Sequence, residues 1–175
     1  MHTGKAGSRC SVDYFTLNYD TLIEDALFLE KIPVADGFNG GVTGWWDMRA
    51  YNSDEAAAKV FKVHGSVDWC LLDDDILPRR IRHSIKEEID NEPVLIWPAA
   101  TKYIESQRDP FAQILTKMRE TLRPQQNEVI LTIIGYSFGD AHINDELNRA
   151  LLEADGRLTI IVCTEMEKPE QIWGD

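Results

Sequence analysis

The sequence predicts an α/β protein with an open, doubly wound and mostly parallel sheet, and three patterns lead to this prediction. The apolar run 129–134 (VILTII) is followed by a polar turn, an amphipathic helix and a second apolar run at 158–162. Near the start of the chain, a short run at 13–17 also precedes a helical pattern. Apolar strands without alternation are typically buried on both faces, and strand–helix–strand connections of this length favour parallel pairing.

The first strand is expected at 13–17, and a helix follows it at once. Thr21 and Glu24 have the spacing of a capping box, which places the helix start directly after Asn18-Tyr19-Asp20. The expected buried face of this helix is broad and consists of Leu22, Ile23, Ala26, Leu27 and Leu29. Asn18 then lies at the carboxyl end of the strand.

The middle of the chain contains two short strands and a longer helix. The run KVFKV indicates a strand that stops at His64-Gly65, where glycine permits a turn. The run 94–97 ends at Pro98 and leads into a loop with Lys102. Asp109 as N-cap and Pro110 at the first helical position begin a helix. Its apolar residues recur at helical spacing and are Phe111, Ile114, Leu115, Met118 and Leu122.

The last helix lies between the two apolar runs. Its expected buried stripe is Ile143, Leu147, Ala150, Leu151 and Ala154, and Gly156 suits the left-handed position just past its end.

No repeat or long linker divides the chain, so residues 1–175 are expected to form a single domain. Residues 1–12 are read as an irregular N-terminus, and residues 36–54 and 73–92 as loops or insertions. With 43% hydrophobic and 27% charged residues, the composition is that of a globular protein. The formal charge of −12 disfavours nucleic acid and anionic membranes as direct partners.

The cysteines and the hydropathy of the chain indicate its compartment. Three widely spaced cysteines without a CxxC pair predict neither a disulfide framework nor a thiolate zinc site. No apolar run approaches the roughly 20 residues needed to span a bilayer. We therefore expect a soluble protein in a reducing cytoplasm.

Three of the expected strands end in polar residues of chemical use. These are Asn18-Tyr19-Asp20, His64-Gly65 and Gly135-Tyr136-Ser137. In open parallel sheets, ligands bind outside the carboxyl ends of the strands, where helix N-termini offer free backbone donors. The functional site is therefore expected at this edge of the sheet.

Each motif also has a purely structural reading, and both readings stay open here. Asn18 and Asp20 could cap the following helix, and His64 could be a turn residue hydrogen-bonded to the backbone. Ser137 could belong to a phosphate-cradling turn or to a tight strand-to-helix connection. The segment GFNGGVTG follows no clear strand, so it is read as a flexible loop that could form a lid.

Taken together, the motifs resemble those of the sirtuins. Thr16-Leu17-Asn18-Tyr19-Asp20 matches the sirtuin T-x-N-x-D motif, KVHGS at 62–66 is similar to the His-Gly turn, and GYSF at 135–138 is similar to the Gly-Thr-Ser turn. The resemblance covers 13–163, in the same order, and is nearest to the sirtuin-like branch of bacterial antiphage defence, whose members hydrolyse NAD. Pro98, Lys102 and Asp109-Pro110 look like its companion features.

The sequence departs from the sirtuin pattern at two places. Protein-deacylating sirtuins carry a four-cysteine zinc ribbon after the His-Gly turn, whereas only Cys70 follows it here. The resemblance therefore implies NAD hydrolysis without a metal rather than deacylation. The family also begins with a strand and a Gly-Ala-Gly-x-Ser turn for the pyrophosphate, of which GKAGS at 4–8 is only a faint echo. We therefore expect a Rossmann-like, sirtuin-type sheet that is incomplete.

The resemblance implies that NAD is the substrate and that its nicotinamide–ribose bond is cleaved, giving nicotinamide and ADP-ribose or a cyclic product. Asn18 would hold the ribose or the attacking water, and His64 would accept a proton. Asp20 would contact the carboxamide or orient Asn18. The remaining residues expected to bind NAD are Thr16, Gly65, Gly135, Tyr136 and Ser137.

Partners follow from the same resemblance, which implies a homo-oligomer or a defence-system partner such as an ATPase. A different reading also stays open, namely a catalytically inactive or partial nucleotide-binding or assembly module, because the pyrophosphate turn is missing. Trp45, Trp46, Trp69 and Trp97 lie in or beside irregular segments and would suit an interface of such a module.

Overall fold

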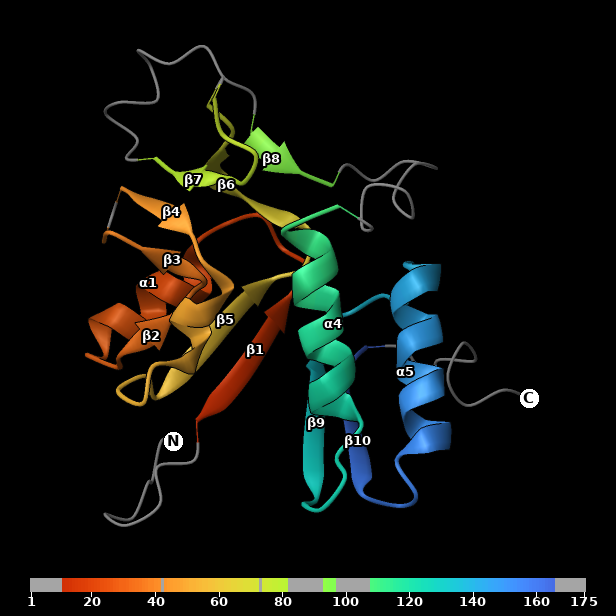
Figure 1. Cartoon of the computed structure of the whole chain (residues 1–175). Helices are drawn as coiled ribbons and strands as arrows, with labels where there is room; N and C mark the ends of the chain where they lie inside the picture. The colour runs from red at the N-terminus through yellow and green to blue at the C-terminus, as the bar shows by residue number, and fades with distance from the viewer. Residues whose placement is uncertain (1–10, 42, 73, 82–92, 97–107, 166–175) are drawn as a thin grey trace. The chain divides into compact units, whose positions relative to one another are not determined.

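The computed structural model describes residues 11–41, 43–72, 74–81, 93–96 and 108–165. The chain divides into two compact units, Met1–Ile114 and Leu115–Asp175. The fold is mixed α/β with parallel sheets, which confirms the predicted fold class (Figure 1). Within these described residues, no helix is both long and apolar enough to cross a membrane.

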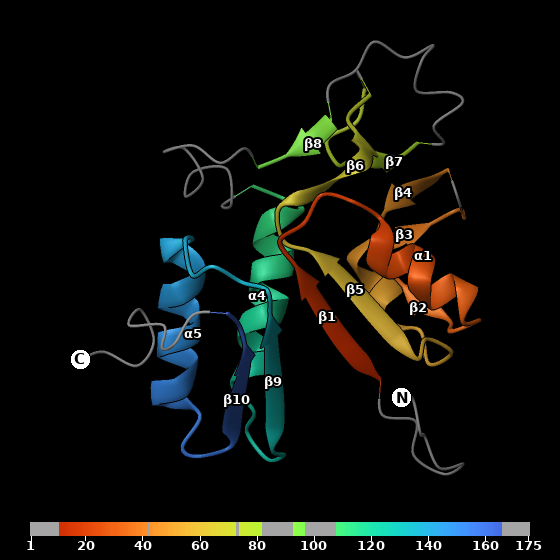
Figure 2. The ribbon, with the colours of Figure 1, turned by 180° about the vertical axis from the view of Figure 1, so that it is seen from behind.

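The first unit contains a parallel sheet with the strand order β1-β5-β2. Its strands are β1 (Val12–Thr16), β5 (Ala58–Lys62) and β2 (Val34–Ala35). β1 and β5 lie side by side in Figures 1 and 2, and their register pairs Thr16 with Lys62 at the carboxyl ends. The two strand ends that carry the first two motifs therefore meet at one edge, as the sequence predicted.

Helix α1 (Leu22–Leu29) packs on one face of this sheet. Its buried apolar residue, Leu27, forms a core cluster with Ala58 and Val60 of β5. The broad apolar face predicted for this helix is correct only for Leu27 and Ile23, which pack in the core. Leu29 is 82% exposed, and Leu22 and Ala26 are exposed as well. A narrow sheet, in which β2 contributes only two residues, offers room for one row of helix side chains.

The capping box predicted at the start of α1 is also absent. The Thr21 hydroxyl donates to the Asp25 carboxylate at 2.9 Å and makes no bond to a backbone amide of the first turn. The helix nevertheless begins where the sequence indicated, because the Asp20 carboxylate accepts the amide of Leu22. The Glu24 carboxylate instead lies near Lys62 of β5.

An aromatic stack covers the opposite face of the parallel sheet. Phe15 stacks on its register partner Phe61 with ring centroids 4.7 Å apart, and Phe61 stacks on Tyr51 at 4.1 Å. Tyr51 belongs to the 3-10 helix η1 (Met48–Asn52), and its hydroxyl donates to the carbonyl of Val60 at 3.0 Å. Side chains thus cover both faces of the parallel sheet, although only Thr16 of β1 is fully buried.

A second, largely antiparallel sheet completes the first unit and has the strand order β3-β4-β7-β6-β8. Its strands are β3 (Phe38–Asn39), β4 (Gly44–Trp46), β7 (Arg79–Arg80), β6 (Gly65–Cys70) and β8 (Pro93–Leu95). Residues 36–54, read above as a loop or insertion, contain β3, β4 and η1. The described part of 73–92 contains β7, and residues 82–92 lie outside the described residues. Strands of two or three residues are too short to show alternation in a sequence.

The tryptophans of this sheet are mainly core residues. The rings of Trp46 and Trp69 lie 5.4 Å apart, both also contact Phe38, and both are buried. Trp45 is half exposed, and Trp97 lies outside the described residues. Core packing therefore accounts for two of the four tryptophans that were considered for an interface.

The second unit contains the parallel pair β9 (Val129–Ile134) and β10 (Leu158–Cys163), joined by α5 (Ala141–Glu153). Helix α4 (Phe111–Leu122) begins in the first unit and continues into the second. All five apolar residues predicted for α4 are buried, and so are four of the five predicted for the α5 stripe, the exception being Leu151. Gly156 has a φ of 76°, as predicted for a residue past a helix end.

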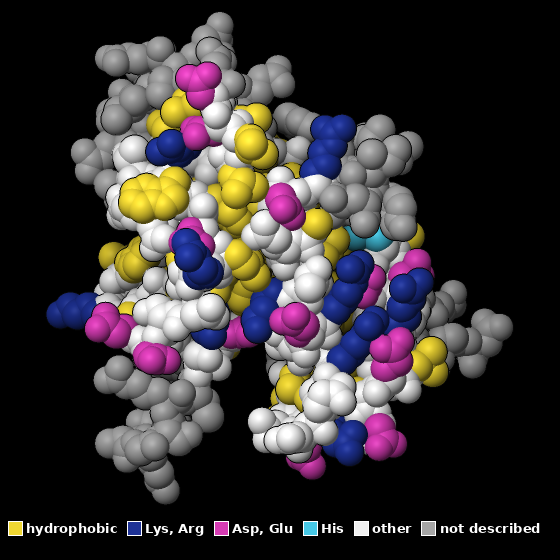
Figure 3. Space-filling view, viewed as in Figure 1, with side chains coloured by type: hydrophobic (Ala, Val, Ile, Leu, Met, Phe, Trp, Pro, Cys, Tyr) yellow, Lys and Arg dark blue, Asp and Glu magenta, His cyan; other side chains and the backbone are white. Residues whose placement is uncertain are grey.

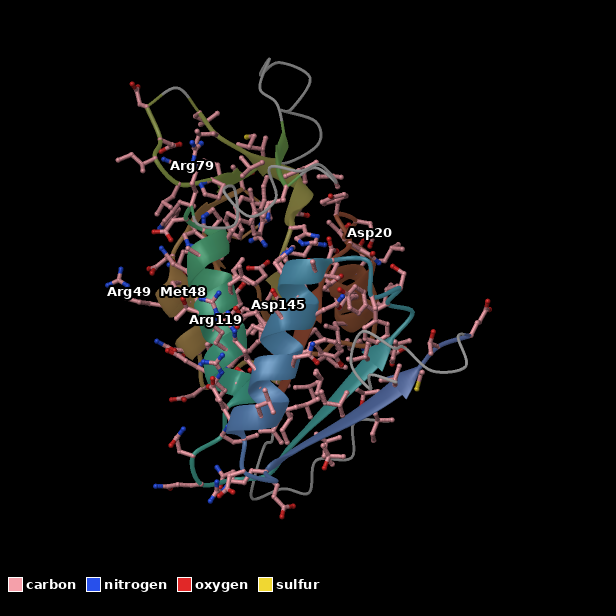
Figure 4. The ribbon with its side chains drawn as sticks, turned by 90° about the vertical axis from the view of Figure 1, so that its right-hand side faces the viewer. Asp20, Met48, Arg49, Arg79, Arg119 and Asp145 are labelled. Carbon is pink, nitrogen blue, oxygen red and sulfur yellow. The ribbon has the colours of Figure 1, made fainter. Side chains whose placement is uncertain are left out.

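The prediction that residues 129–134 are buried on both faces is wrong. Alternate residues of β9 are exposed, with Ile130 at 68% and Ile134 at 77%. Figure 4 shows α5 to one side of the two strands, which accounts for the half-buried residues between the exposed ones. An apolar run is compatible with burial of both faces of a strand. Whether both faces are buried depends on the elements that pack against it.

Charged side chains connect α4 and α5. Glu146 of α5 is buried, and its carboxylate accepts from Arg119 of α4 at 2.8 Å and lies 3.6 Å from Arg123. Figure 3 shows basic and acidic side chains mixed over these two helices, and Figure 4 shows Arg119 on α4 beside α5. The buried Glu146 carboxylate thus pairs with the guanidinium groups of both Arg119 and Arg123.

Candidate functional site

The turn after β1 is shaped by Thr16 and presents Asn18. The buried Thr16 hydroxyl accepts the amide of Asn18 at 3.1 Å, and the Thr16 carbonyl accepts the amide of Val63 at 3.0 Å. The Asn18 side chain is exposed. Thr16 therefore acts on the backbone, while Asn18 is the residue that a ligand can reach.

Tyr19 fastens this turn to the segment that follows His64. Its carbonyl accepts the Ser66 hydroxyl at 3.1 Å and the amide of Val67 at 2.9 Å, and its hydroxyl donates to the carbonyl of Ile96 at 2.6 Å. The T-x-N-x-D and His-Gly motifs are thus joined by several direct hydrogen bonds. This contact between segments far apart in the sequence was predicted from the strand ends.

Asp20 has two separate contacts. One carboxylate oxygen accepts the amide of Leu22 at 3.1 Å, which is the capping use that the sequence left open for this residue. Its carbonyl accepts a hydrogen bond from the ammonium of Lys62. Figure 4 shows Asp20 near the turn that leads into α1.

His64 and Gly65 lie in the turn between β5 and β6. His64 is 3% exposed, and its carbonyl accepts the amide of Ile96 at 2.9 Å. Gly65 has a φ of 88°, and a Cβ at this position would lie 2.2 Å from the carbonyl oxygen of Val94. The close backbone approach of β8 therefore requires glycine here, independently of any ligand.

Lys62 and Glu24 form a buried ion pair that the sequence reading missed. The Lys62 ammonium lies 3.6 Å from a Glu24 carboxylate oxygen, and the Lys62 side chain is 2% exposed. Burial raises the pKa of Glu24, and the charge of Lys62 opposes that rise. The available signal was a lysine within the apolar run VFKVH, next to the predicted site.

The turn after β9 in the second unit is held by its own side chains. The Tyr136 hydroxyl lies 2.9 Å from the Asn144 side-chain oxygen and 3.1 Å from the Asp140 carbonyl oxygen, either of which can accept its proton. The Asn144 side-chain amide donates to the carbonyl of Phe138 at 2.8 Å. Phe138 has a φ of 56°, a strained value that these bonds support. Burial raises the pKa of Tyr136 to about 12. Tyr136 thus organises the turn, and Asn144 is a contributor that the sequence reading did not single out.

Gly135 and Ser137 form the open part of the same turn. Both residues are exposed, Gly135 has a φ of 65°, and nothing lies within 4 Å of a Cβ built on it. The turn leads into the N-terminus of α5, where backbone amides and the helix dipole favour anionic groups. A phosphate or another anionic group of a ligand can therefore approach this side of the turn closely.

A family model described as a SIR2-like domain matches residues 12–173. The chain belongs to the SIR2-like family. SIR2-like domains use NAD and are commonly enzymatic, so membership indicates an NAD-related function for this chain. No curated protein matches it.

Several residues expected in this SIR2-like domain lie outside the described part of the structure. They are Pro98, Lys102 and the GKAGS segment at 4–8. Pro110 is described and is buried just before α4. Among the described residues, no group of His, Cys, Asp and Glu side chains is arranged to hold a metal ion.

Proposed function

We propose that this SIR2-like domain is an NAD hydrolase that cleaves the nicotinamide–ribose bond and releases nicotinamide and ADP-ribose or a cyclic product. The observation that carries the proposal is the direct bonding between the turn of Asn18 and the turn of His64, through Thr16–Val63 and Tyr19–Val67 backbone bonds. This arrangement holds an amide side chain and an imidazole on one pair of adjacent turns, in a family that uses NAD.

In the hydrolytic reaction, a water oxygen bonds to the anomeric carbon of the ribose as nicotinamide leaves with the electron pair of the broken bond. Asn18, exposed at the end of β1, orients this water or the ribose hydroxyls. His64 takes the proton that the attacking water loses. The oxocarbenium-like transition state requires that the water is held on one face of the sugar.

The proposal also assigns roles to residues of the turn after β9. The Ser137 hydroxyl and the backbone amides at the start of α5 bind a ribose hydroxyl or the phosphates. No protein atom lies within 4 Å of a Cβ built on Gly135, so the space beside this residue is open to a ligand. Tyr136 supports the turn rather than the ligand, since its hydroxyl is engaged by Asn144. Asp20 orients the segment that carries Asn18.

The proposal is tested by incubating the purified chain with NAD and quantifying nicotinamide and ADP-ribose by chromatography. Asn18→Ala should lower turnover by about 10²-fold or more, and His64→Ala by about 10²–10⁴-fold, the range for loss of a general base. Asn52→Ala changes an exposed asparagine of η1 and serves as the matched control. Full turnover by a His64→Ala/Asn18→Ala double variant would contradict the assignment.

The same family resemblance supports a role in antiviral defence. We propose that the domain acts in the cytoplasm, as a homo-oligomer or with a partner such as an ATPase, and lowers cellular NAD upon infection. NAD content measured during phage infection in cells that carry the wild-type or the His64→Ala chain tests this role. Equal NAD loss with both chains would contradict it. Nucleotide binding that survives His64→Ala, without any product, would instead support the binding-module alternative.

A further inference from the structure

Lys62 is in an unusual position for a lysine. It is the last residue of β5, it pairs in register with Thr16, and its side chain is 2% exposed. Lysine is almost never fully buried unless it is paired, because the ammonium loses its hydration. Among the described residues, the Lys62 ammonium pairs with the carboxylate of Glu24 and donates to the carbonyl of Asp20.

The partner carboxylate is itself in an unfavourable place. Glu24 lies in the first turn of α1, is buried, and has one carboxylate oxygen without a hydrogen-bond partner among the described residues. A buried ion pair with such incomplete satisfaction is weak support for stability, since replacing both partners by apolar residues is often neutral or stabilising. Stability alone therefore gives little reason for this pair.

The position of the contact suggests a different use. The Asn18-Tyr19-Asp20 turn is held at its first end by Thr16 and in its middle by the β6 contacts of Tyr19. At its last end, the carbonyl of Asp20 is held by Lys62 from across the sheet edge. Lys62 is also two residues before His64. Its side chain therefore connects the strand that leads to His64 with the turn that carries Asn18.

We propose that Lys62, oriented by Glu24, is a positioning residue that fixes the Asp20 peptide and thereby the turn that presents Asn18. The inference rests on the proposed NAD hydrolysis for its effect on rate, but not for its effect on the turn. Lys62 does not bind the substrate in this account, because its ammonium is buried and directed at a backbone carbonyl. Its effect should appear in kcat rather than in KM, since misplacement of a reacting group lowers the rate of the chemical step.

The test uses the double variant Lys62→Met/Glu24→Leu, which removes both charges and leaves neither one buried alone. Lys59→Met is the matched control, because Lys59 lies on the same strand and takes part in neither contact. Thermal unfolding should show the double variant folded and about as stable as the control. Its kcat should fall about 10–100-fold, with KM for NAD within about twofold of the control value. Lys62→Arg retains a cation and a donor and should recover part of kcat.

A second readout does not depend on activity. Hydrogen exchange of the Val67 amide, whose acceptor is the carbonyl of Tyr19, and of the Leu22 amide, whose acceptor is Asp20, reports on the turn directly. Both amides should exchange at least about tenfold faster in the double variant, while β1 amides keep their protection. A folded double variant with unchanged exchange would overturn the inference, as would kcat equal to that of Lys59→Met. If wild type releases no nicotinamide, the proposed function fails and the exchange result alone decides.

Discussion

Replacing Gly65 by alanine is expected to destabilise the first unit more than the same change at Gly41, a glycine with open space around it. The added Cβ would lie 2.2 Å from the carbonyl oxygen of Val94 and 3.2 Å from Leu95 Cα, so the β6–β8 pairing must shift. Because the φ of Gly65 is 88°, the left-handed backbone adds about 1–2 kcal/mol for a residue with a Cβ. Overpacking adds about 1–3 kcal/mol, which makes about 2–5 kcal/mol in total.

The matched control is Gly41→Ala. Gly41 has a φ of 70° and nothing within 4 Å of a built Cβ, so only the backbone contribution of about 1–2 kcal/mol applies. For a chain of this size, about 2–4 °C per kcal/mol predicts that the melting temperature falls by about 4–20 °C for Gly65→Ala and about 2–8 °C for Gly41→Ala.

The assay is chemical and thermal unfolding followed by tryptophan fluorescence, because Trp46 and Trp69 are buried in the first unit and report on it. The reasoning predicts that Gly65→Ala loses clearly more stability than Gly41→Ala. If the two variants lose the same stability, the close approach of β8 to this turn is not a feature of the folded protein.

Three further predictions concern single side chains. Burial raises the pKa of Glu24 above 4.5, so the folded state binds this proton more tightly than the unfolded state. The free energy of unfolding should therefore fall as pH rises from about 4.5 through the folded pKa. Glu24→Gln should make the slope of unfolding free energy against pH less negative in this range. Asn144→Ala removes the bonds to Tyr136 and Phe138 and should cost about 1–3 kcal/mol in urea unfolding; a loss equal to that of an exposed asparagine would contradict the network. Tyr51→Phe deletes one buried hydrogen bond and should cost about 1 kcal/mol by the same measurement at neutral pH.

The elements that sequence analysis predicted well are those with local signals. The α4 residues from Phe111 to Leu122 recur at helical spacing, and all five predicted positions are buried. The strand ends at Thr16 and Lys62 meet because adjacent parallel strands bring their carboxyl ends to one edge. Family membership is equally accessible from the sequence, since three short motifs in the correct order indicate it and the family model confirms it.

The residues that sequence analysis misjudged depend on contacts between distant segments. Glu24 had the spacing of a capping-box residue relative to Thr21, but its carboxylate turns to Lys62 of β5 instead. Ile130 and Ile134 belong to an apolar run, yet the elements around β9 leave them exposed. In each case the local pattern is compatible with two environments, and only the three-dimensional arrangement selects one.

The antiparallel sheet of the first unit was missed for a different reason. β3, β4 and β7 have two or three residues each, and the glycines at 37, 40 and 41 resemble those of a flexible loop. Their pairing depends on buried aromatic contacts such as Phe38 with Trp69, which join segments that are distant in the sequence. The periodicity of apolar residues in the sequence therefore could not predict the pairing of these strands.

The most direct test of the central claim is the release of nicotinamide from NAD by the purified chain, measured beside Asn18→Ala, His64→Ala and the control Asn52→Ala. The account predicts release by wild type and Asn52→Ala, and a loss of about 10²-fold or more in each of the other two. Equal release by all four chains, or release by none of them while the wild-type chain is folded, would contradict NAD hydrolysis at the Asn18–His64 turns.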